Sequence, residues 1–286
     1  MGGQDLVGTT LVDKYQLIEL AREGRFGDFW TAKRLADDRK VQVKLLKPSL
    51  FMDGEAIRRF QRETRVMANF DHPNVLRVLD HGRNEMGDPY VVTEFVDGRV
   101  LADHISDLEL DLDGVCHIAS QIAMVLGSAH ARGIIHRGLT PDEILLCQVG
   151  TDKERVKVLD FGLAHHTSTS GEVGLTQVGQ RLGKCEYMAP EYIEEFELTA
   201  LSDVYVLGII TFEMLTGQPP FVGRALSVMT KHIEEEPFPP SDLAAEVEVP
   251  SWLDDLILAM LAKDPAERPQ DALVVARAFT VQAWPI

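Results

Sequence analysis

Cysteine is scarce in this chain of 286 residues, and the three cysteines, Cys116, Cys147 and Cys185, lie far apart. Their spacing argues against a disulfide framework and against a zinc cluster built from paired cysteines. Positive charge is also in short supply, because 28 basic residues face 45 acidic ones and give a formal net charge of −17. Binding to a phosphate backbone depends on lysine and arginine, so we expect neither nucleic acid nor an anionic membrane surface as a partner. We interpret the negative charge as a contribution to solubility.

Long apolar runs are missing as well. No stretch approaches the roughly 18–20 apolar residues that a membrane helix requires. The first residues form neither the basic nor the apolar segment of a signal peptide. Together with the unpaired cysteines, this favours a cytoplasmic location, either for the chain itself or for the cytosolic domain of a larger protein. Hydrophobic residues make up 45% of the chain and charged residues 26%, which is typical of a folded globular protein.

The pattern of apolar residues changes near residues 94–98. Before this point, short apolar or alternating runs between glycine-rich or charged turns predict strands, at 15–20, 29–32, 40–46, 75–80 and 90–95. One helix is predicted around residues 57–67. After the break, apolar residues recur at helical spacing, as over residues 115–129 and 253–261. Ser251 and Asp254 form the pattern of a helix start.

Five short motifs follow one another along the chain. They read Gly24-Arg-Phe-Gly27, Val41-Gln-Val-Lys44, His136-Arg-Gly-Leu-Thr-Pro-Asp-Glu143, Val158-Leu-Asp-Phe-Gly162 and Tyr187-Met-Ala-Pro-Glu191. In this order they resemble the signature set of a protein kinase, from about Tyr15 to about Phe279. Among kinases, the chain is most similar to bacterial Ser/Thr kinases of eukaryotic type. The resemblance implies an α+β, bilobal fold. Residues 1–96 would form an antiparallel-sheet N-lobe with one main helix, and residues 97–286 a helical C-lobe.

The resemblance also assigns nucleotide-handling roles. Lys44 matches the strand lysine that holds the α- and β-phosphates of ATP, Glu63 matches the helix carboxylate that orients this lysine, and Asp160 matches the metal-binding aspartate. The other nucleotide-binding candidates share a position in the phosphate loop or along the base slot. They are Arg22, Gly24, Gly27, Phe29, Gln42, Thr93, Glu94, Val96 and Leu145.

The catalytic loop departs from the family pattern at three positions. Gly138 stands where kinases carry the aspartate that accepts the hydrogen bond of the substrate hydroxyl. Thr140 replaces a lysine that contacts the γ-phosphate, and Glu143 replaces the asparagine that binds the second metal. A carboxylate at Glu143 could still bind Mg²⁺, but it adds a negative charge beside those of ATP. We interpret it as drift at a position released from constraint.

The phosphate loop and the base slot are altered too. Arg22 replaces the first loop glycine, and it either blocks the approach of phosphates or contributes charge to them. Phe29 and Gln42 replace a valine and an alanine that normally contact adenine. Overfilling a packed site costs about 1–3 kcal/mol, or roughly tenfold to more than a hundredfold in affinity. Retained Lys44 favours ATP binding and the two larger side chains oppose it.

Residues that hold the fold together are retained. By resemblance, Glu191 pairs with Arg268, and Asp203 caps the backbone of the catalytic loop. Four further residues fall where the family stacks an apolar spine, namely Met67, Val78, His136 and Phe161. We interpret His136 as a packing residue and not as a base or a metal ligand.

Groups that transfer phosphate are therefore missing, whereas groups that maintain the fold are present. This pattern indicates a pseudokinase, a catalytically impaired Ser/Thr kinase-like domain that acts as a scaffold or an allosteric partner. Its expected partner is a protein: a phospho-dependent binding domain, another kinase or a neighbouring domain of its parent chain. The first alternative is an ATP-binding kinase or other transferase with residual activity through Lys44, Glu63 and Asp160. The second is a domain that binds ATP as a structural ligand without turnover.

Overall fold

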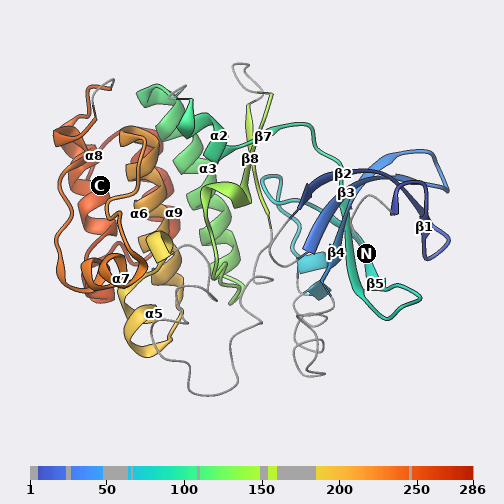
Figure 1. Ribbon diagram of the computed structural model, residues 1–286. Helices are drawn as coiled ribbons and strands as arrows, with labels where there is room; N and C mark the ends of the chain where they lie inside the picture. The colour runs from blue at the N-terminus through green and yellow to red at the C-terminus, as the bar shows by residue number, and fades with distance from the viewer. Residues whose placement is uncertain are drawn as a thin grey trace. The chain divides into compact units, whose positions relative to one another are not determined.

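The chain divides into two compact units, residues 1–97 and residues 98–286, which we describe separately (Figure 1). This computed structural model describes residues 6–23, 27–47, 64–65, 67–107, 110–148, 154–159, 185–244 and 247–285.

The first unit is built on an antiparallel sheet in the order β1-β2-β3-β4-β6-β5. Its strands are β1 Thr10–Leu11, β2 Tyr15–Glu23, β3 Gly27–Arg34, β4 Lys40–Leu46, β5 Val78–Arg83 and β6 Pro89–Glu94. The strand predicted over 75–80 begins later, at Val78. The reason is a turn in which the backbone N–H of Val75 donates to the carbonyl of His72 (3.0 Å).

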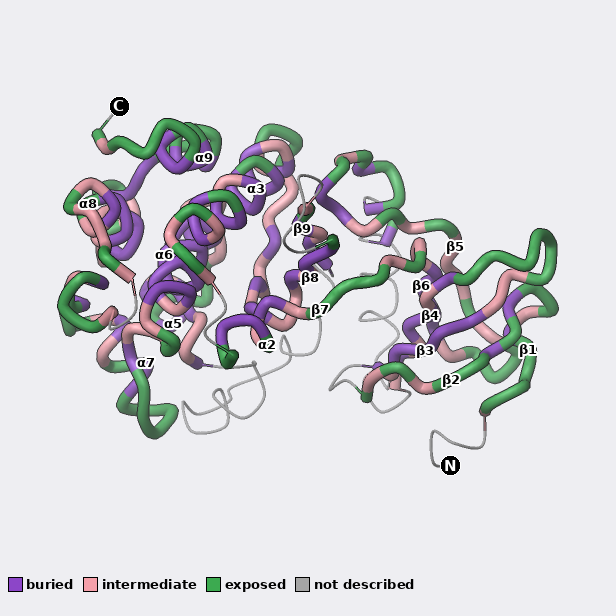
Figure 2. Tube along the Cα trace, turned by 90° about the horizontal axis from the view of Figure 1, so that it is seen from above, coloured by how far each residue is buried: buried purple, intermediate pink, exposed green. Residues whose placement is uncertain are grey.

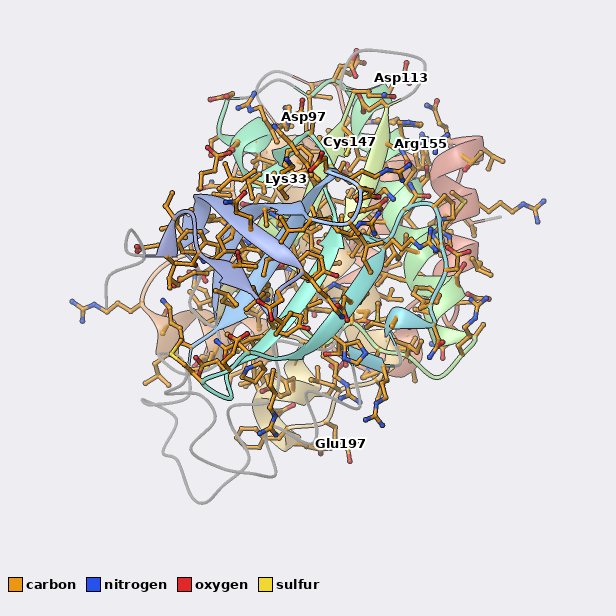
Figure 3. The ribbon with its side chains drawn as sticks, turned by 90° about the vertical axis from the view of Figure 1, so that its right-hand side faces the viewer. Lys33, Asp97, Asp113, Cys147, Arg155 and Glu197 are labelled. Carbon is orange, nitrogen blue, oxygen red and sulfur yellow. The ribbon has the colours of Figure 1, made fainter. Side chains whose placement is uncertain are left out.

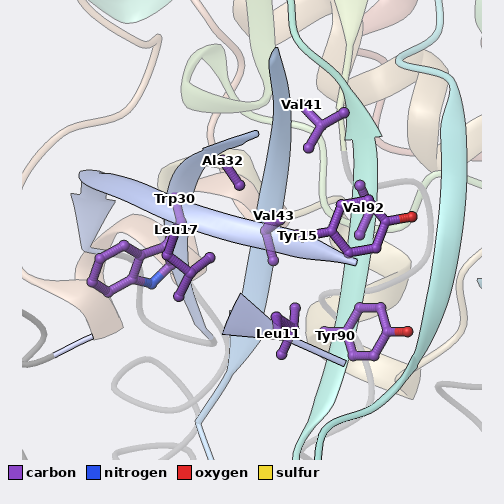
Figure 4. Packing of buried hydrophobic residues seen from close by; sticks show 9 residues of the cluster. All are labelled: Leu11, Tyr15, Leu17, Trp30, Ala32, Val41, Val43, Tyr90 and Val92. Atoms are coloured by element: carbon purple, nitrogen blue, oxygen red, sulfur yellow. The ribbon is translucent and has the colours of Figure 1, made fainter. Parts of the chain in front are cut away.

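The two faces of this sheet carry different side chains, because successive residues of a strand point to opposite faces. One face holds the apolar core of the unit (Figure 4). Its buried members are Leu11, Tyr15, Leu17, Trp30, Ala32, Val41, Val43, Tyr90 and Val92. The alternate positions of the same strands carry Phe29, Thr31, Gln42 and Lys44 on the opposite face. The sheet therefore places its polar and cationic residues apart from its core.

The helix predicted around residues 57–67 is described only in part. Residues 64–65 and 67–68 are helical, and Met67 is buried with 8% of its surface exposed. Glu63 lies outside the described residues.

The second unit combines a three-stranded sheet, in the order β7-β8-β9, with helices. The strands are β7 Arg99–Val100, β8 Ile144–Cys147 and β9 Arg155–Val158. The α-helices are α2 Leu101–Ser106, α3 Leu112–His130, α5 Pro190–Glu195, α6 Ala200–Thr216, α7 Ala225–Glu234, α8 Ser251–Met260 and α9 Ala272–Val281. Short 3-10 turns are η3 Pro141–Glu143, η5 Cys185–Tyr187, η6 Pro240–Asp242 and η7 Pro265–Glu267. The α+β fold class predicted from the sequence is confirmed.

Helices α3 and α6 carry much of the buried surface of this unit (Figure 2). Gly127 lies at a close contact between α3 and α9, because a Cβ atom at this position would lie 2.5 Å from Cγ of Leu273. By length and composition α3 is apolar enough to cross a membrane, but 61% of its most apolar window is buried inside the protein. Its hydropathy is explained by its place in this core.

The predicted start of α8 is wrong in its details. The helix does begin at Ser251, but its N-cap is Pro250 and no side chain caps it. The Asp254 carboxylate instead accepts a hydrogen bond from the backbone N–H of Ser241 (3.0 Å). In contrast, α6 begins with a capping box in which Thr199 and Ser202 bond each other's backbone.

His232 on α7 is fully buried, and its ring has a hydrogen-bonding partner on each side. Tyr205 Oη donates to Nδ1 (2.9 Å), and Nε2 donates to the carbonyl of Glu186 (3.1 Å). Burial, with a smaller effect from nearby Lys263, lowers the pKa of His232 to about 3. The neutral ring therefore stabilises the fold above the ordinary histidine pKa of about 6.5.

We expect this stability to be lost as the pH falls from about 6.5 towards 3, because the unfolded chain binds the proton that the folded chain excludes. The measurement is the free energy of unfolding by urea as a function of pH, for the wild type and His232→Gln. The difference between the two should shrink on acidification, since only the wild type loses the histidine contribution. A difference that does not change between pH 7 and pH 4.5 would contradict this assignment.

Candidate functional site

A row of three side chains crosses the non-core face of the first unit. Arg22 on β2 is paired in register with Phe29 on β3, and Phe29 is paired with Lys44 on β4. The Arg22 guanidinium carbon lies 4.4 Å from the centroid of the Phe29 ring, and Lys44 Nζ lies 4.9 Å from it. Each contact is worth about 0.5–2 kcal/mol, depending on its desolvation. The ring thus lies in register between the two strands that carry these cations.

An irregularity in β2 makes this arrangement possible. The pairing of β2 with β3 shifts between Leu20 and Arg22, so that Leu20 is opposite Trp30 while Arg22 is opposite Phe29. Trp30 and Phe29 point to opposite faces. The shift therefore brings Arg22 to the face that carries Lys44, where only 8% of Phe29 and 9% of Lys44 are exposed.

Gln42 continues the same face one step along the strands. It is half-buried and lies in register between Thr31 on β3 and Thr93 on β6. Two other predicted residues follow in the same unit. Glu94 is half-buried and accepts a hydrogen bond from the backbone N–H of Arg77 (3.2 Å), and Val96 is half-buried. Gln42 and Thr93 therefore lie on the same face of the sheet as Lys44. The Glu94 carboxylate is bonded to the backbone of Arg77 instead.

Gly27 is the first residue of β3, and it lies close to the backbone of β4. A Cβ atom here would lie 2.5 Å from the carbonyl oxygen of Leu45, so a larger residue would force the backbone apart. Gly24, the other glycine of the predicted phosphate loop, lies outside the described residues.

In the second unit, Asp203 on α6 holds the loop that contains His136, Arg137 and Gly138. Its carboxylate accepts hydrogen bonds from the backbone N–H groups of His136 (2.8 Å) and Arg137 (3.1 Å) and from His130 Nε2 (2.8 Å). Arg137 has a φ of 67°, in the left-handed region that non-glycine residues rarely adopt. A strained residue of this kind persists only where its surroundings determine it. The buried Asp203 carboxylate supplies that constraint.

The three departures from the kinase pattern lie on this loop and on the turn that follows. Gly138 and Thr140 are half-buried, and Glu143 ends η3. The backbone of Glu143 is fixed on both sides, because its N–H donates to the carbonyl of Thr140 (2.9 Å) and its carbonyl accepts from Leu159 (2.8 Å). Leu145 follows in β8, half-buried and paired with Val100. The loop backbone is thus ordered, and position 138 carries no side chain.

Arg268 and Glu191 form an ion pair in the second unit. The Arg268 side chain is fully buried, and its two terminal nitrogens donate to the two Glu191 oxygens (2.9 and 2.8 Å). The remaining N–H groups of Arg268 donate to the carbonyls of Ala262, Leu201 and Lys263. Burial acts to raise the pKa of the Glu191 carboxyl, but the hydrogen bonds from Arg268 and from Ser202 (2.6 Å) together outweigh it, so the pKa is lowered.

The predicted spine residues are distributed over both units. Met67 and Val78 belong to the first unit. His136 belongs to the second, where it is buried and its Nε2 donates to the carbonyl of Leu159 (3.0 Å). Asp160 and Phe161 lie outside the described residues. Within the part of the chain that the structure describes, no group of three or more His, Cys, Asp or Glu side chains could hold a metal ion.

A pocket of about 570 Å³ lies elsewhere in the second unit, between α5, the start of α6 and the segment before η7. Its lining includes the acidic residues Glu194, Glu195, Glu197 and Asp264, together with Lys263. Glu197, labelled in Figure 3, is exposed. Burial lowers the pKa of Lys263 to about 8, and its Nζ lies 4.7 Å from the centroid of the Phe221 ring.

The residues of the first unit fit one part of ATP better than the other. Two cations, Arg22 and Lys44, flank the Phe29 ring with charge that suits phosphates, and Gly27 lies where β3 packs against the backbone of Leu45. The base side carries the buried Phe29 ring and the Gln42 side chain where the family pattern has smaller residues. Lys44 and Arg22 would hold the phosphates, and in a kinase ATP supplies the phosphoryl group for transfer.

Sequence reasoning located most of these residues but not the stacking of Arg22 on Phe29. The two positions are seven residues apart, and a regular hairpin register does not say that they face each other. The only signal was that both are large where the family pattern has small residues.

Comparison with known proteins agrees with this arrangement. The family model described as the protein kinase domain matches residues 15–280. The serine/threonine-protein kinase pkn3 of Myxococcus xanthus is 37% identical over 271 residues, which cover 94% of this chain and 50% of that protein. The probable serine/threonine-protein kinase PknB of Lactococcus lactis is 37% identical over 268 residues, covering 93% of this chain and 41% of that protein. The chain thus spans half or less of the length of these curated relatives.

A solved structure agrees in fold. The crystal structure of the Mycobacterium tuberculosis PknI kinase domain superposes with a TM-score of 0.73 at 24% sequence identity, covering 96% of this chain and 98% of that chain. At this identity the likeness is a likeness of fold. The match of the family model over nearly the whole chain carries the assignment further. The chain belongs to the protein kinase domain family, with homologues among the bacterial serine/threonine-protein kinases.

Proposed function

We propose that this domain is a kinase-fold binding module whose own phosphoryl transfer is lost or strongly slowed. The observation that carries the proposal is Gly138, which has no side chain at the position of the catalytic aspartate. Asp203 holds the backbone of the loop before Gly138, so the loop is in place while the aspartate side chain is absent. General-base assistance contributes about 10²–10⁴ in rate. Thr140 and Glu143 remove two further phosphate- and metal-directed groups.

A second candidate function is phosphoryl transfer itself, slow and dependent on Lys44, Glu63 and Asp160. The comparisons favour this candidate, because the relatives are named serine/threonine-protein kinases. Kinase catalysis consists mainly of positioning and charge neutralisation, so retained Lys44 supports it. Gly138 opposes it.

A module without transfer would act by binding a protein, such as a phospho-dependent binding domain, another kinase or a neighbouring domain of the same parent chain. The net charge of −17 supports a protein partner over nucleic acid or an anionic membrane surface. We also propose a cytoplasmic location, in line with three free cysteines that are all buried.

The experiment is to incubate the purified domain with Mg²⁺-ATP and to follow phosphate incorporation by intact-protein mass spectrometry. Lys44→Met is the control, because it removes the phosphate-binding lysine of any kinase-type reaction. We expect the wild type to gain no more phosphate than Lys44→Met. Incorporation by the wild type that Lys44→Met abolishes would establish the second candidate instead. A parallel thermal-melt series with ATP reports binding independently of transfer, because a ligand of the folded state raises the melting temperature.

A further inference from the structure

We propose that the first unit is a binding site for polyphosphate-like anions that no longer favours the adenine base. The site consists of Arg22 and Lys44 on either side of Phe29. This inference rests on the proposed function, since it deals with the nucleotide face of the same kinase fold. It adds a ligand class, because the anion would be selected over the nucleoside.

Arg22 and Lys44 form the half of the site that would bind the anion. Arg22 and Lys44 both contact the ring of Phe29, at 4.4 and 4.9 Å from its centroid, from the neighbouring strands β2 and β4. Arg22 is half-buried, so solvent reaches it, and its planar guanidinium suits bidentate contact with phosphate. A charge-assisted hydrogen bond to phosphate is stronger than a cation–ring contact. A phosphate ligand can therefore recruit Arg22 from the ring.

Two described acidic side chains of the first unit, Asp28 and Glu94, make contacts with other groups. Asp28 precedes Phe29 in β3, so it points to the opposite face, where it lies 3.5 Å from Lys47 Nζ. Glu94 accepts a hydrogen bond from the backbone of Arg77. These contacts of Asp28 and Glu94 do not involve Arg22. Arg22 thus brings positive charge to this face of a chain whose overall charge is strongly negative.

Phe29 and Gln42 define the other half of the proposal. Phe29 is only 8% exposed, and both cations contact its ring. An adenine ring would have to displace it or share its space, and overfilled packing is unfavourable. Inorganic tripolyphosphate requires no such displacement. Its affinity should therefore equal or exceed that of ATP, and adenosine should not bind.

The test is isothermal titration calorimetry with sodium tripolyphosphate, ATP and adenosine as separate probes, in EDTA so that no metal ion binds to the phosphates. Four proteins are compared: the wild type, Arg22→Gln, Phe29→Val and Arg39→Gln. Arg39 is a matched control, because it is an exposed arginine of the same unit that pairs with Asp37 (3.4 Å). Melting curves without ligand check that each variant is folded.

In the wild type we expect tripolyphosphate to bind at least as tightly as ATP. Arg22→Gln should weaken both ligands by about tenfold or more, because it removes a charged phosphate contact. Arg39→Gln should change neither. Phe29→Val should tighten ATP by about tenfold while leaving tripolyphosphate within about threefold, because it relieves packing on the base side only.

Three results would overturn the proposal: no binding of tripolyphosphate, ATP binding more tightly than tripolyphosphate in the wild type, or equal effects of Arg22→Gln and Arg39→Gln. These outcomes are separate from failure of the proposed function. Phosphate incorporation that depends on Lys44 would refute the loss of transfer whichever ligand binds, whereas the calorimetric comparison reports affinity without any turnover.

Discussion

Phosphoryl transfer is expected to rise by about 10²–10⁴-fold when the three altered catalytic-loop positions are restored by Gly138→Asp, Thr140→Lys and Glu143→Asn. The reason is that a carboxylate at position 138 would accept the hydrogen bond of the attacking hydroxyl, while the other two changes return a phosphate contact and a metal ligand. Gly138 is not among the described glycines with positive φ, so an aspartate should enter the loop without left-handed strain. Asp203 already holds the adjacent backbone.

The measurement is the initial rate of phosphate transfer to a serine/threonine peptide mixture at several ATP concentrations. All variants should carry Phe29→Val, so that the base side does not limit the rate, and Phe29→Val alone is the reference. The matched control replaces Gly138→Asp by Gly138→Asn in the same background. Asparagine has nearly the shape of aspartate but accepts no proton, so this control should stay near the reference rate. Equal rates for the aspartate and asparagine variants would show that the missing base is not what limits transfer.

Arg268→Met is expected to destabilise the protein by about 3–5 kcal/mol, because it leaves the partly buried Glu191 carboxylate without its cation. The side chain of Arg268 is fully buried, and its donors bond Glu191 and three carbonyl groups from α6 and the segment before η7. Methionine fills much of the volume but satisfies none of these acceptors. The measurement is the shift of the urea midpoint, converted to free energy with an unchanged m-value.

Arg277→Met on α9 is the control for this prediction. Arg277 is exposed, and exposed substitutions usually stay within about 0.5 kcal/mol. The double variant Glu191→Gln with Arg268→Met should recover part of the loss, since it removes the unpaired charge. If Arg268→Met were as mild as Arg277→Met, the ion pair would not contribute to the stability of this fold.

The sequence was most informative where chemistry is encoded in a few consecutive letters. The Ala-Pro-Glu motif and a late arginine predicted the contact between Glu191 and Arg268, because this pairing depends on residue type at fixed places in the fold. The same holds for Asp203 and the loop backbone. Alternation of apolar residues located the strands of the first unit, since one face of the sheet is buried throughout.

Features that depend on register or on competing partners were harder to predict. The start of β5 moved to Val78 because a local turn at His72 competes with strand pairing. Asp254 bonds Ser241 instead of capping its own helix, and sequence spacing alone does not reveal this competitor. The contact of Arg22 with Phe29 depends on a shift in the pairing of β2, which no local pattern announces.

The most direct test of the central claim is the steady-state rate of ADP formation from Mg²⁺-ATP by the wild-type domain, measured beside Lys44→Met. This assay counts transfer to any acceptor, including water, so it does not depend on knowing a substrate. With Gly138 in place of the catalytic aspartate, we predict the same background rate for both proteins. A wild-type rate that exceeds that of Lys44→Met and saturates with ATP would contradict the account and identify the domain as a working phosphotransferase.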